Sequence, residues 1–198
     1  MVIHNPLPTS ATIKAKSKVT GLVDKGADKG ALILTERTLK DAESGLDLAT
    51  LTSTTFARGN GGYDGPSDEA PRPHKVPERE PDFAVDLTTL DMAALIYRLS
   101  GDYNPLHASP SVARAAGFPK PILHGLCSLG VAGHAILKGC CDYDAKRLKS
   151  LQLRFSSPVY PGETVRTEIW RDGANISFKS KIVERDVVVL DNGHATVE

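Results

Sequence analysis

Alternating apolar and polar residues mark the start of the chain. The alternation runs through residues 12–19, 31–39 and 46–56, and a two-residue period is typical of strands that bury one face. Turn segments that contain Gly and Asp separate these runs at residues 24–29 and 40–45. We therefore predict three strands here, with no amphipathic helix among them.

A second block of strand patterns closes the chain. A short run at residues 83–87 enters it, and four longer runs follow at residues 148–156, 164–171, 176–184 and 187–197. Proline-containing steps at residues 6–8 and 158–161 each lead into strands joined by short turns, which begin at residues 12 and 164. This similarity indicates a weak internal repeat.

The segment between the two blocks has a different composition. Residues 58–82 are rich in Gly, Pro and charged side chains and show no apolar period. We predict a linker or a loose surface excursion there. The chain then divides into a partial N-terminal unit of strands at 1–57, the linker, and a C-terminal unit at 83–198.

The longest helical pattern lies at residues 125–138. Its residues are mostly apolar or small, so we expect a buried helix, and Gly139 is expected to end it. A shorter helical pattern follows Thr88, which has the spacing of a capping box with Asp91. Gly101 is expected to end this second helix.

The connection after the second helix carries a concentrated set of polar groups. The run Tyr-Arg-Leu-Ser-Gly-Asp-Tyr-Asn-Pro-Leu-His spans residues 97–107 and contains Asp102, Asn104 and His107. A Ser-Pro pair just beyond it opens the next short helix. Because Gly and Pro interrupt any regular helix in this run, the three polar side chains can point into one cleft.

These residue types suit acid-base chemistry. Because the unperturbed histidine side chain has a pKa near neutrality, His107 is a residue type suited to proton transfer. Asp102 can share a bound water with it or act as its acid-base partner, and Asn104 can orient that water or the imidazole. The backbone N–H of Gly125 offers a donor for an oxyanion, because it lies at the positive end of the buried helix and no side chain blocks access.

The same residues also have structural interpretations. Asp102 taken alone is typical of a cap or an Asx turn, and His107 taken alone is typical of a satisfied core or surface histidine. Their joint occurrence with Asn104, Pro105 and the downstream Gly125 favours a functional site. We assign His124 and His134 to structure and Tyr97 to the core.

Composition narrows the functional classes. The 198 residues carry 24 basic and 24 acidic side chains, so the net charge of zero gives no electrostatic footprint for nucleic acid or an anionic membrane. No apolar run is long enough to span a bilayer, and no secretory or peroxisomal signal is recognised. Cytoplasm is the expected compartment, with the peroxisome left open. The three cysteines are expected to be free thiols, and no metal site is predicted.

Three motifs resemble those of one enzyme family. The run at residues 97–107, His-Gly-Leu-Cys-Ser-Leu-Gly at 124–130 and Arg-Phe-Ser-Ser-Pro-Val-Tyr-Pro-Gly-Glu at 154–163 closely resemble the (R)-specific enoyl-CoA hydratase family, also called hydratase 2 or MaoC-like. The resemblance implies an α+β hot-dog fold, in which a curled antiparallel sheet wraps a long buried helix. It further implies an incomplete double hot dog, because the family's first unit carries a long helix and preceding strands that have no counterpart here.

The resemblance also implies an activity and its ligands. It implies hydration of a trans-2-enoyl-CoA to the (R)-3-hydroxyacyl-CoA in fatty-acid metabolism, including β-oxidation, with a coenzyme A thioester as substrate and no metal or redox cofactor. The catalytic roles fall on Asp102, Asn104, His107 and Gly125. Substrate contacts fall on Lys25, Tyr103, Pro105, Leu106 and Phe155. A homodimer is the expected assembly, with no nucleic-acid or membrane partner.

Two other functions stay open at this point. Another hot-dog acyl-CoA enzyme, such as a thioesterase, would release a free thiol from its substrate. Alternatively, because the first unit lacks its helix, the chain would be a non-catalytic remnant that binds an acyl-CoA or a partner protein.

Overall fold

The chain forms two compact units. The computed structural model describes residues 1–67 and 70–198, and the units comprise Met1–Pro73 and His74–Glu198. None of the helices in the described part of the chain has the length and hydropathy that crossing a membrane requires.

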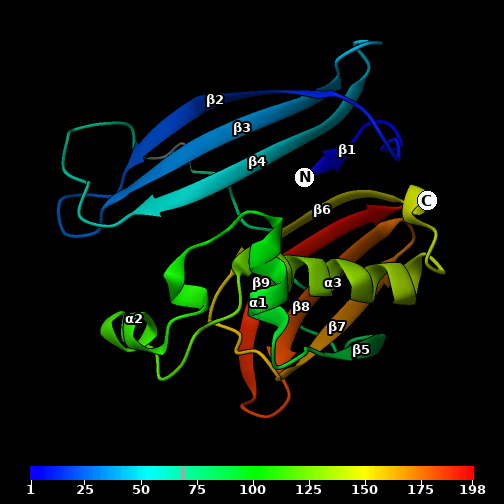
Figure 1. Cartoon of the computed structure of the whole chain (residues 1–198). Helices are drawn as coiled ribbons and strands as arrows, with labels where there is room; N and C mark the ends of the chain where they lie inside the picture. Colours follow the sequence, from blue (N-terminus) through cyan, green and yellow to red (C-terminus); the bar gives the residue numbers. More distant parts are fainter. Residues whose placement is uncertain (68–69) are drawn as a thin grey trace. The chain divides into compact units, whose positions relative to one another are not determined.

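The first unit is an antiparallel sheet. It consists of β1 (Val2–Ile3), β2 (Ile13–Asp24), β3 (Ala31–Asp41) and β4 (Asp47–Ala57), in the order β2-β3-β4-β1. Figure 1 shows β2, β3 and β4 as three long neighbouring strands. They confirm the three predicted strands, whereas β1 is too short to produce a recognisable pattern. No helix occurs in the described part of this unit.

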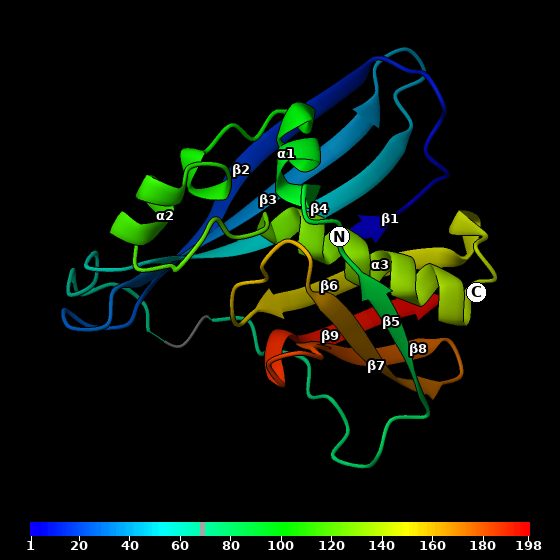
Figure 2. The same cartoon turned by 60° about the horizontal axis from the view of Figure 1, so that its bottom comes forward.

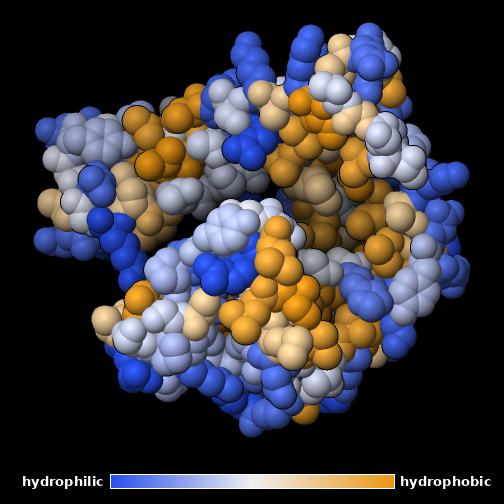
Figure 3. Space-filling model, viewed as in Figure 1, coloured by the Kyte–Doolittle hydropathy of each residue, from blue (hydrophilic) through white to orange (hydrophobic). Residues whose placement is uncertain are grey.

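The two faces of the first sheet differ in polarity. Ile13, Val19 and Leu22 are apolar residues of β2 that are about half exposed, and Figure 3 shows apolar residues at the surface of the molecule. Lys14 and Lys18, at intervening positions of the same strand, lie on the opposite face. The apolar face is therefore only partly covered.

The second unit is a sheet wrapped around one long helix. Its strands are β5 (Phe83–Thr88), β6 (Leu148–Phe155), β7 (Thr164–Asp172), β8 (Asn175–Ile182) and β9 (Val187–Val197), all paired antiparallel in the order β6-β9-β8-β7-β5. Helix α3 (Gly125–Cys140) lies along one face of this sheet in Figures 1 and 2 and contacts β5, β6 and β7. The predicted hot-dog fold is confirmed.

The core of the second unit lies between α3 and the sheet. Ala132, Ala135 and Ile136 of α3 are fully buried, as are Ile169 of β7 and Phe178 of β8. Small residues on the helix allow the sheet to approach it closely. The burial of this helix accounts for the mostly apolar sequence of the segment.

Short helical elements occupy the connection between β5 and α3. They are α1 (Ala93–Tyr97), the 3₁₀ turns Arg98–Ser100 and Pro105–His107, and α2 (Pro110–Ala115). A further 3₁₀ turn, Ala145–Arg147, follows α3. Gly101 has φ of 113°, a left-handed conformation that ends the first 3₁₀ turn as predicted. The predicted start of α2 at Ser109 and Pro110 is also confirmed.

The predicted capping box at Thr88 is wrong. Thr88 ends β5, where its hydroxyl lies 3.0 Å from the hydroxyl of Thr164, and α1 begins only at Ala93 without a side-chain cap. Thr88 therefore pairs with β7 as part of a strand, although local spacing predicted it as the start of a helix.

The predicted end of the buried helix at Gly139 is also wrong, because α3 continues through Cys140. A Cβ atom at Gly139 would lie 2.6 Å from the ring of Phe83. This glycine therefore permits close contact between α3 and β5 rather than ending the helix.

The segment at 58–82 contains no helix or strand among its described residues, and residues 68–69 lie outside them, so the linker stays a prediction. On its N-terminal side the carboxylate of Asp24 accepts hydrogen bonds from the backbone N–H groups of Gly62 and Tyr63, at 2.7 and 2.8 Å. On its C-terminal side the indole of Trp170 donates to the carbonyl of Arg79 at 2.7 Å. These are tertiary contacts that composition does not reveal.

Candidate active site

The predicted site residues lie on a bend between the first 3₁₀ turn and α2. The Asp102 carboxylate accepts a hydrogen bond from the N–H of Asn104 at 3.2 Å, which closes an Asx turn. Asn104 in turn accepts from the N–H of Leu106 at 3.0 Å and caps the second 3₁₀ turn. The sequence thus uses two local side-chain acceptors to shape the segment that leads to His107.

His107 is positioned for proton transfer. Its side chain is 9% exposed, and its Nδ1 lies 2.8 Å from the carbonyl oxygen of Ile122. Because a carbonyl oxygen only accepts hydrogen bonds, Nδ1 carries the proton in the neutral ring. The Nε2 lone pair is consequently available as a base.

His124 lies against His107. The two rings are stacked, with 3.8 Å between their centroids. The ring of Tyr97 also contacts His124, at a centroid distance of 4.7 Å. The Nε2 of His124 lies 3.2 Å from the backbone carbonyl oxygen of Asp102. Burial lowers the pKa of His124 below its usual value.

From its sequence context, His124 is assigned to a structural role. In the structure its Nε2 lies within hydrogen-bond distance of a backbone carbonyl, and its ring also belongs to the acid-base cluster. Its position directly before Gly125, at the start of the long helix, is the signal that pointed toward the site.

Asp102, His107 and His124 form a compact cluster. One carboxylate oxygen of Asp102 and one ring nitrogen from each histidine all lie within 4.8 Å of one another. Two imidazoles and a carboxylate are a donor set known from zinc sites. Here, however, the two rings are stacked with an interplanar angle of 25°, so their lone pairs lie side by side and do not converge on one point. This geometry favours proton transfer over metal binding.

The N-terminus of α3 supplies hydrogen-bond donors beside this cluster. No side chain caps the helix, and among the described residues no acceptor bonds the N–H groups of its first three residues, Gly125 to Cys127. A Cβ atom at Gly125 would lie 3.3 Å from the ring of Phe155, so the glycine keeps the approach to these donors open.

A cavity connects the base with these donors. Its volume is about 290 Å³, and His107, Gly125 and Phe155 line it together with Phe118, Val159 and Leu190. The lining is mainly apolar around a few polar groups, as is typical of a small-molecule site. Three of the predicted site residues therefore meet in one cavity of the second unit.

Other predicted residues take different positions. The Tyr103 ring is 63% exposed and lies under the guanidinium of Arg98, 5.5 Å from its centroid. Pro105 is the first residue of the second 3₁₀ turn, and Leu106 is half-buried beside it. Tyr103, Pro105 and Leu106 are not among the described residues that line the cavity. Their predicted substrate contacts stay predictions.

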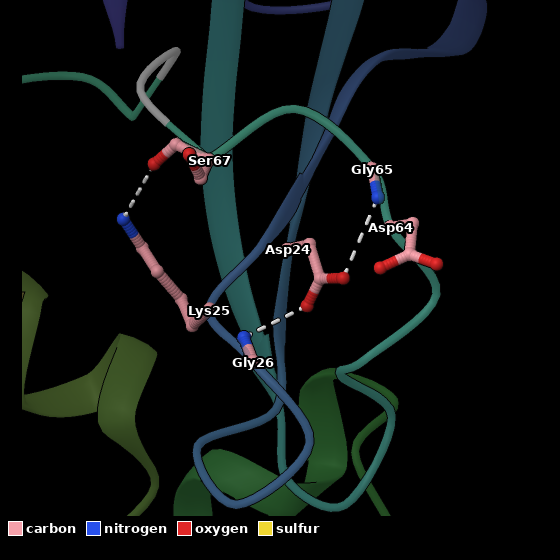
Figure 4. A pocket seen from close by; sticks show the side chains of 6 residues that line it. All are labelled: Asp24, Lys25, Gly26, Asp64, Gly65 and Ser67. Carbon is pink, nitrogen blue, oxygen red and sulfur yellow. Dashed lines mark hydrogen bonds between the residues drawn. The ribbon is translucent and has the colours of Figure 1, made fainter.

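Lys25 belongs to the first unit. It lines a pocket of about 340 Å³ with Asp24, Gly26, Asp64, Gly65 and Ser67, shown in Figure 4. Its ammonium group donates to the carbonyl of Ser67 at 3.4 Å. The Asp24 carboxylate accepts hydrogen bonds from Gly26 and Gly65 in the same view, so the turn that carries Lys25 is held by its neighbour.

The chain is similar to known proteins over nearly its whole length. The chain is 41% identical over 197 residues to "Enoyl-CoA hydratase 2, peroxisomal" from Arabidopsis thaliana and 42% identical over 197 residues to "3-hydroxyacyl-thioester dehydratase Y" from Mycobacterium tuberculosis. These matches cover 95% and 96% of the chain, and 63% and 68% of the relatives' own lengths. The crystal structure of a MaoC-like dehydratase from Phytophthora capsici superimposes with a TM-score of 0.93 at 42% identity, covering 100% of this chain and 69% of that one.

Two family models match the two parts of the chain. The MFE-2 hydratase 2 N-terminal domain matches residues 1–59, and the MaoC like domain matches residues 73–193. The second match spans the helix α3, the bend with Asp102 and His107, and most of the surrounding sheet. By this match, and by its identity to relatives over nearly its whole length, the chain belongs to the MaoC-like family.

Proposed function

We propose that the chain catalyses the reversible hydration of a trans-2-enoyl-CoA to the (R)-3-hydroxyacyl-CoA. The observation that carries this proposal is that His107, which is clustered with Asp102, lines an apolar cavity together with Gly125 at the open N-terminus of α3. Hydration of an enoyl thioester needs a base for water, an acid for the α-carbon and donors for the thioester oxygen. The cluster and the helix end contain groups of all three kinds.

The proton transfers are assigned to His107 and Asp102. His107 accepts a proton at Nε2 from the attacking water, and the water oxygen forms a bond to C3 of the substrate. The electron pair of the double bond moves toward C2 and the thioester oxygen, and the carboxylic acid form of Asp102 gives its proton to C2. The proton that His107 took from water then passes to the Asp102 carboxylate, which restores both groups for the next turnover. Positioned acid-base groups of this kind typically contribute ~10²–10⁴-fold to a rate.

The oxyanion is assigned to the first turn of α3. As the thioester oxygen gains negative charge, the N–H of Gly125 donates a hydrogen bond to it, assisted by the positive end of the helix dipole. Loss of one such donor costs about 2.7–4 kcal/mol of transition-state stabilisation in other enzymes. The thioester itself acidifies the α-proton, so this mechanism requires no metal or redox cofactor.

Asn104 has a supporting role in this proposal. Its side-chain oxygen caps the turn that ends at His107, which fixes the direction of the imidazole, and its exposed amide group is assigned to orient the water.

Lys25 and Phe155 are assigned to coenzyme A, because the resemblance places a lysine and an aromatic contact at these positions. Cytoplasm is proposed as the compartment. The peroxisome is the alternative, because the names of two relatives contain "peroxisomal".

A homodimer is proposed as the assembly. The support is the apolar face of the first sheet, where Ile13, Val19 and Leu22 are about half exposed, because exposed apolar surfaces of this kind mark interaction sites. Light scattering at micromolar concentration tests this assembly, and a monomer mass would contradict it.

Enoyl-thioester absorbance tests the activity. Loss of the conjugated absorbance of a trans-2-enoyl-CoA is followed with wild type, His107→Ala and the control His134→Ala, whose histidine lies exposed on α3 beside Tyr143. We expect His107→Ala to lose at least 100-fold in kcat and the control to keep wild-type activity. Equal rates for His107→Ala and wild type would refute the proposal, and release of free thiol would identify a thioesterase.

A further inference from the structure

His124 has the most contacts in the cluster and no role in the chemistry proposed above. It is the residue directly before α3, and its side chain is 1% exposed. A buried histidine that touches both proposed catalytic residues needs an explanation, because burying an imidazole costs free energy unless its polar atoms are satisfied.

The hydrogen bond of His124 defines its protonation. Its Nε2 faces the carbonyl oxygen of Asp102 at 3.2 Å, so this nitrogen carries the proton. Its Nδ1 is buried and has no hydrogen-bond partner among the described residues. Protonating Nδ1 would place in the interior a charge that has no hydrogen-bond partner among the described residues. Burial, His107 and Arg98 lower the pKa of His124, and together they outweigh the Asp102 carbonyl and carboxylate, which raise it. The ring is therefore neutral at pH 7.

The faces of the His124 ring are also occupied. One contact is the stacked ring of His107 and another is the ring of Tyr97, at centroid distances of 3.8 and 4.7 Å. His107 is held at a second point by the carbonyl of Ile122. The stacking and this hydrogen bond together leave the imidazole plane of His107 little freedom to rotate.

The bend that carries Asp102 is held at two consecutive carbonyls. His124 bonds the carbonyl of Asp102, and a guanidinium nitrogen of Arg98 donates to the carbonyl of Tyr103 at 3.2 Å. The Asp102 carboxylate otherwise has only the N–H of Asn104 as a fixed partner among the described residues. The hydrogen bond from His124 is thus the contact that ties the acid to the start of α3.

We infer that His124 is a positioning residue, a neutral imidazole that sets the Asp102 backbone and the His107 ring plane relative to each other and to the oxyanion donors of α3. This inference rests on the proposed hydratase function. It adds a residue that touches neither substrate nor reacting atoms and acts through its two neighbours. Misplacing a catalytic group by about 1 Å typically costs 10²-fold in rate, so the loss falls on kcat.

Two variants separate the hydrogen bond from the ring contacts. His124→Phe keeps an aromatic ring against His107 and removes the donor to Asp102, whereas His124→Gln keeps a donor of similar reach and removes the ring. The exposed His134, which lies on α3, provides the control His134→Phe. We expect His124→Phe to lose about 10–100-fold in kcat with KM within twofold of wild type. We expect His124→Gln to retain more activity than His124→Phe and the control to match wild type.

Several outcomes would overturn the inference. These are wild-type kcat in His124→Phe, a His124→Gln variant no more active than His124→Phe, or an effect confined to KM. Circular dichroism at the assay temperature confirms that each variant is folded. If wild type itself shows no hydration, the proposed function fails separately, and ¹⁵N NMR of the wild-type imidazoles still decides the inference. The Nε2–H neutral tautomer of His124 at pH 7 is expected, and a protonated ring or the Nδ1–H tautomer would contradict it.

Discussion

The imidazole of His107 lies flat against the imidazole of His124, with 3.8 Å between the ring centroids. Two titratable rings this close cannot both become charged without strong repulsion. Protonation of His124 beside His107 is therefore expected to lower the stability of the second unit.

The first prediction concerns acid stability. Burial lowers the pKa of His124 below 6.5, so the native state binds fewer protons than the unfolded chain between the folded pKa and 6.5. The stabilisation is complete above about pH 6.5 and is lost as the pH falls through the folded pKa. We expect the Tm of wild type to fall between pH 7.5 and 5.5 by more than that of His124→Phe. A larger fall in the variant would contradict this, and His134→Phe serves as the control.

The second prediction concerns the open start of α3. Gly125→Ala would bring a Cβ atom to 3.3 Å from the Phe155 ring and partly block the oxyanion donors. We expect at least a tenfold loss of kcat with little change in Tm, because Phe155 is half exposed and can shift. Enoyl-thioester turnover and a thermal melt measure the two quantities.

A glycine on the same helix provides the matched control for Gly125→Ala. A Cβ atom at Gly130 would meet no atom within 4 Å, so Gly130→Ala should keep full activity and gain about 0.5–1 kcal/mol of stability from helix propensity. Equal activity of the two variants would show that the start of α3 does not contact the substrate.

The third prediction concerns the contact between α3 and β5. Gly139→Ala would place a Cβ atom 2.6 Å from the Phe83 ring, so either the ring or the helix must shift. We expect a loss of about 1–3 kcal/mol in the free energy of unfolding, as for other overpacked cores. Urea unfolding measures this loss. A variant as stable as wild type would show that the contact adapts freely.

The fourth prediction concerns the Asp24 carboxylate in the first unit. It is 6% exposed and accepts backbone N–H groups from Gly26, Gly62, Tyr63 and Gly65, which lower its pKa. In Asp24→Ala we expect the amides of Gly62 and Tyr63 to exchange with solvent much faster than in wild type, as measured by hydrogen exchange. In wild type the same protection should be present at neutral pH and be lost as the pH falls through the lowered pKa of Asp24.

Asp41 allows a matched control for the Asp24 variant. Its carboxylate also accepts backbone N–H groups, from Glu43 and Ser44, at the turn between β3 and β4. Asp41→Ala should increase exchange at its own turn and leave Gly62 and Tyr63 protected. Loss of protection at both places in either variant would indicate global unfolding of the unit rather than local release.

Much of the fold follows from local sequence. The alternation predicts the long strands because one face of each is buried, and the run of small and apolar residues predicts α3 because it is covered by the sheet. The spacing within residues 97–107 predicts the bend, since Gly101 adopts a left-handed conformation and Asn104 caps the following turn. These features depend on residues that are neighbours in sequence.

The errors lie where distant residues decide. Thr88 belongs to a strand because β7 pairs with it, and Gly139 lies inside α3 because Phe83 packs against it. Gly62 also has a distant partner, the Asp24 carboxylate, which lies more than thirty positions earlier in the chain. Patterns among residues that are neighbours in sequence do not reveal such distant partners.

The sequence by itself determined the strands, the buried helix, the bend within residues 97–107 and the membership of the family. Only the tertiary structure decided that His124 joins Asp102 and His107, that the proton on His107 lies on Nδ1, and that Gly125 opens into a cavity beside Phe155. The physical reason is that a residue's type fixes which bonds it can make, whereas the fold fixes which partner is within reach.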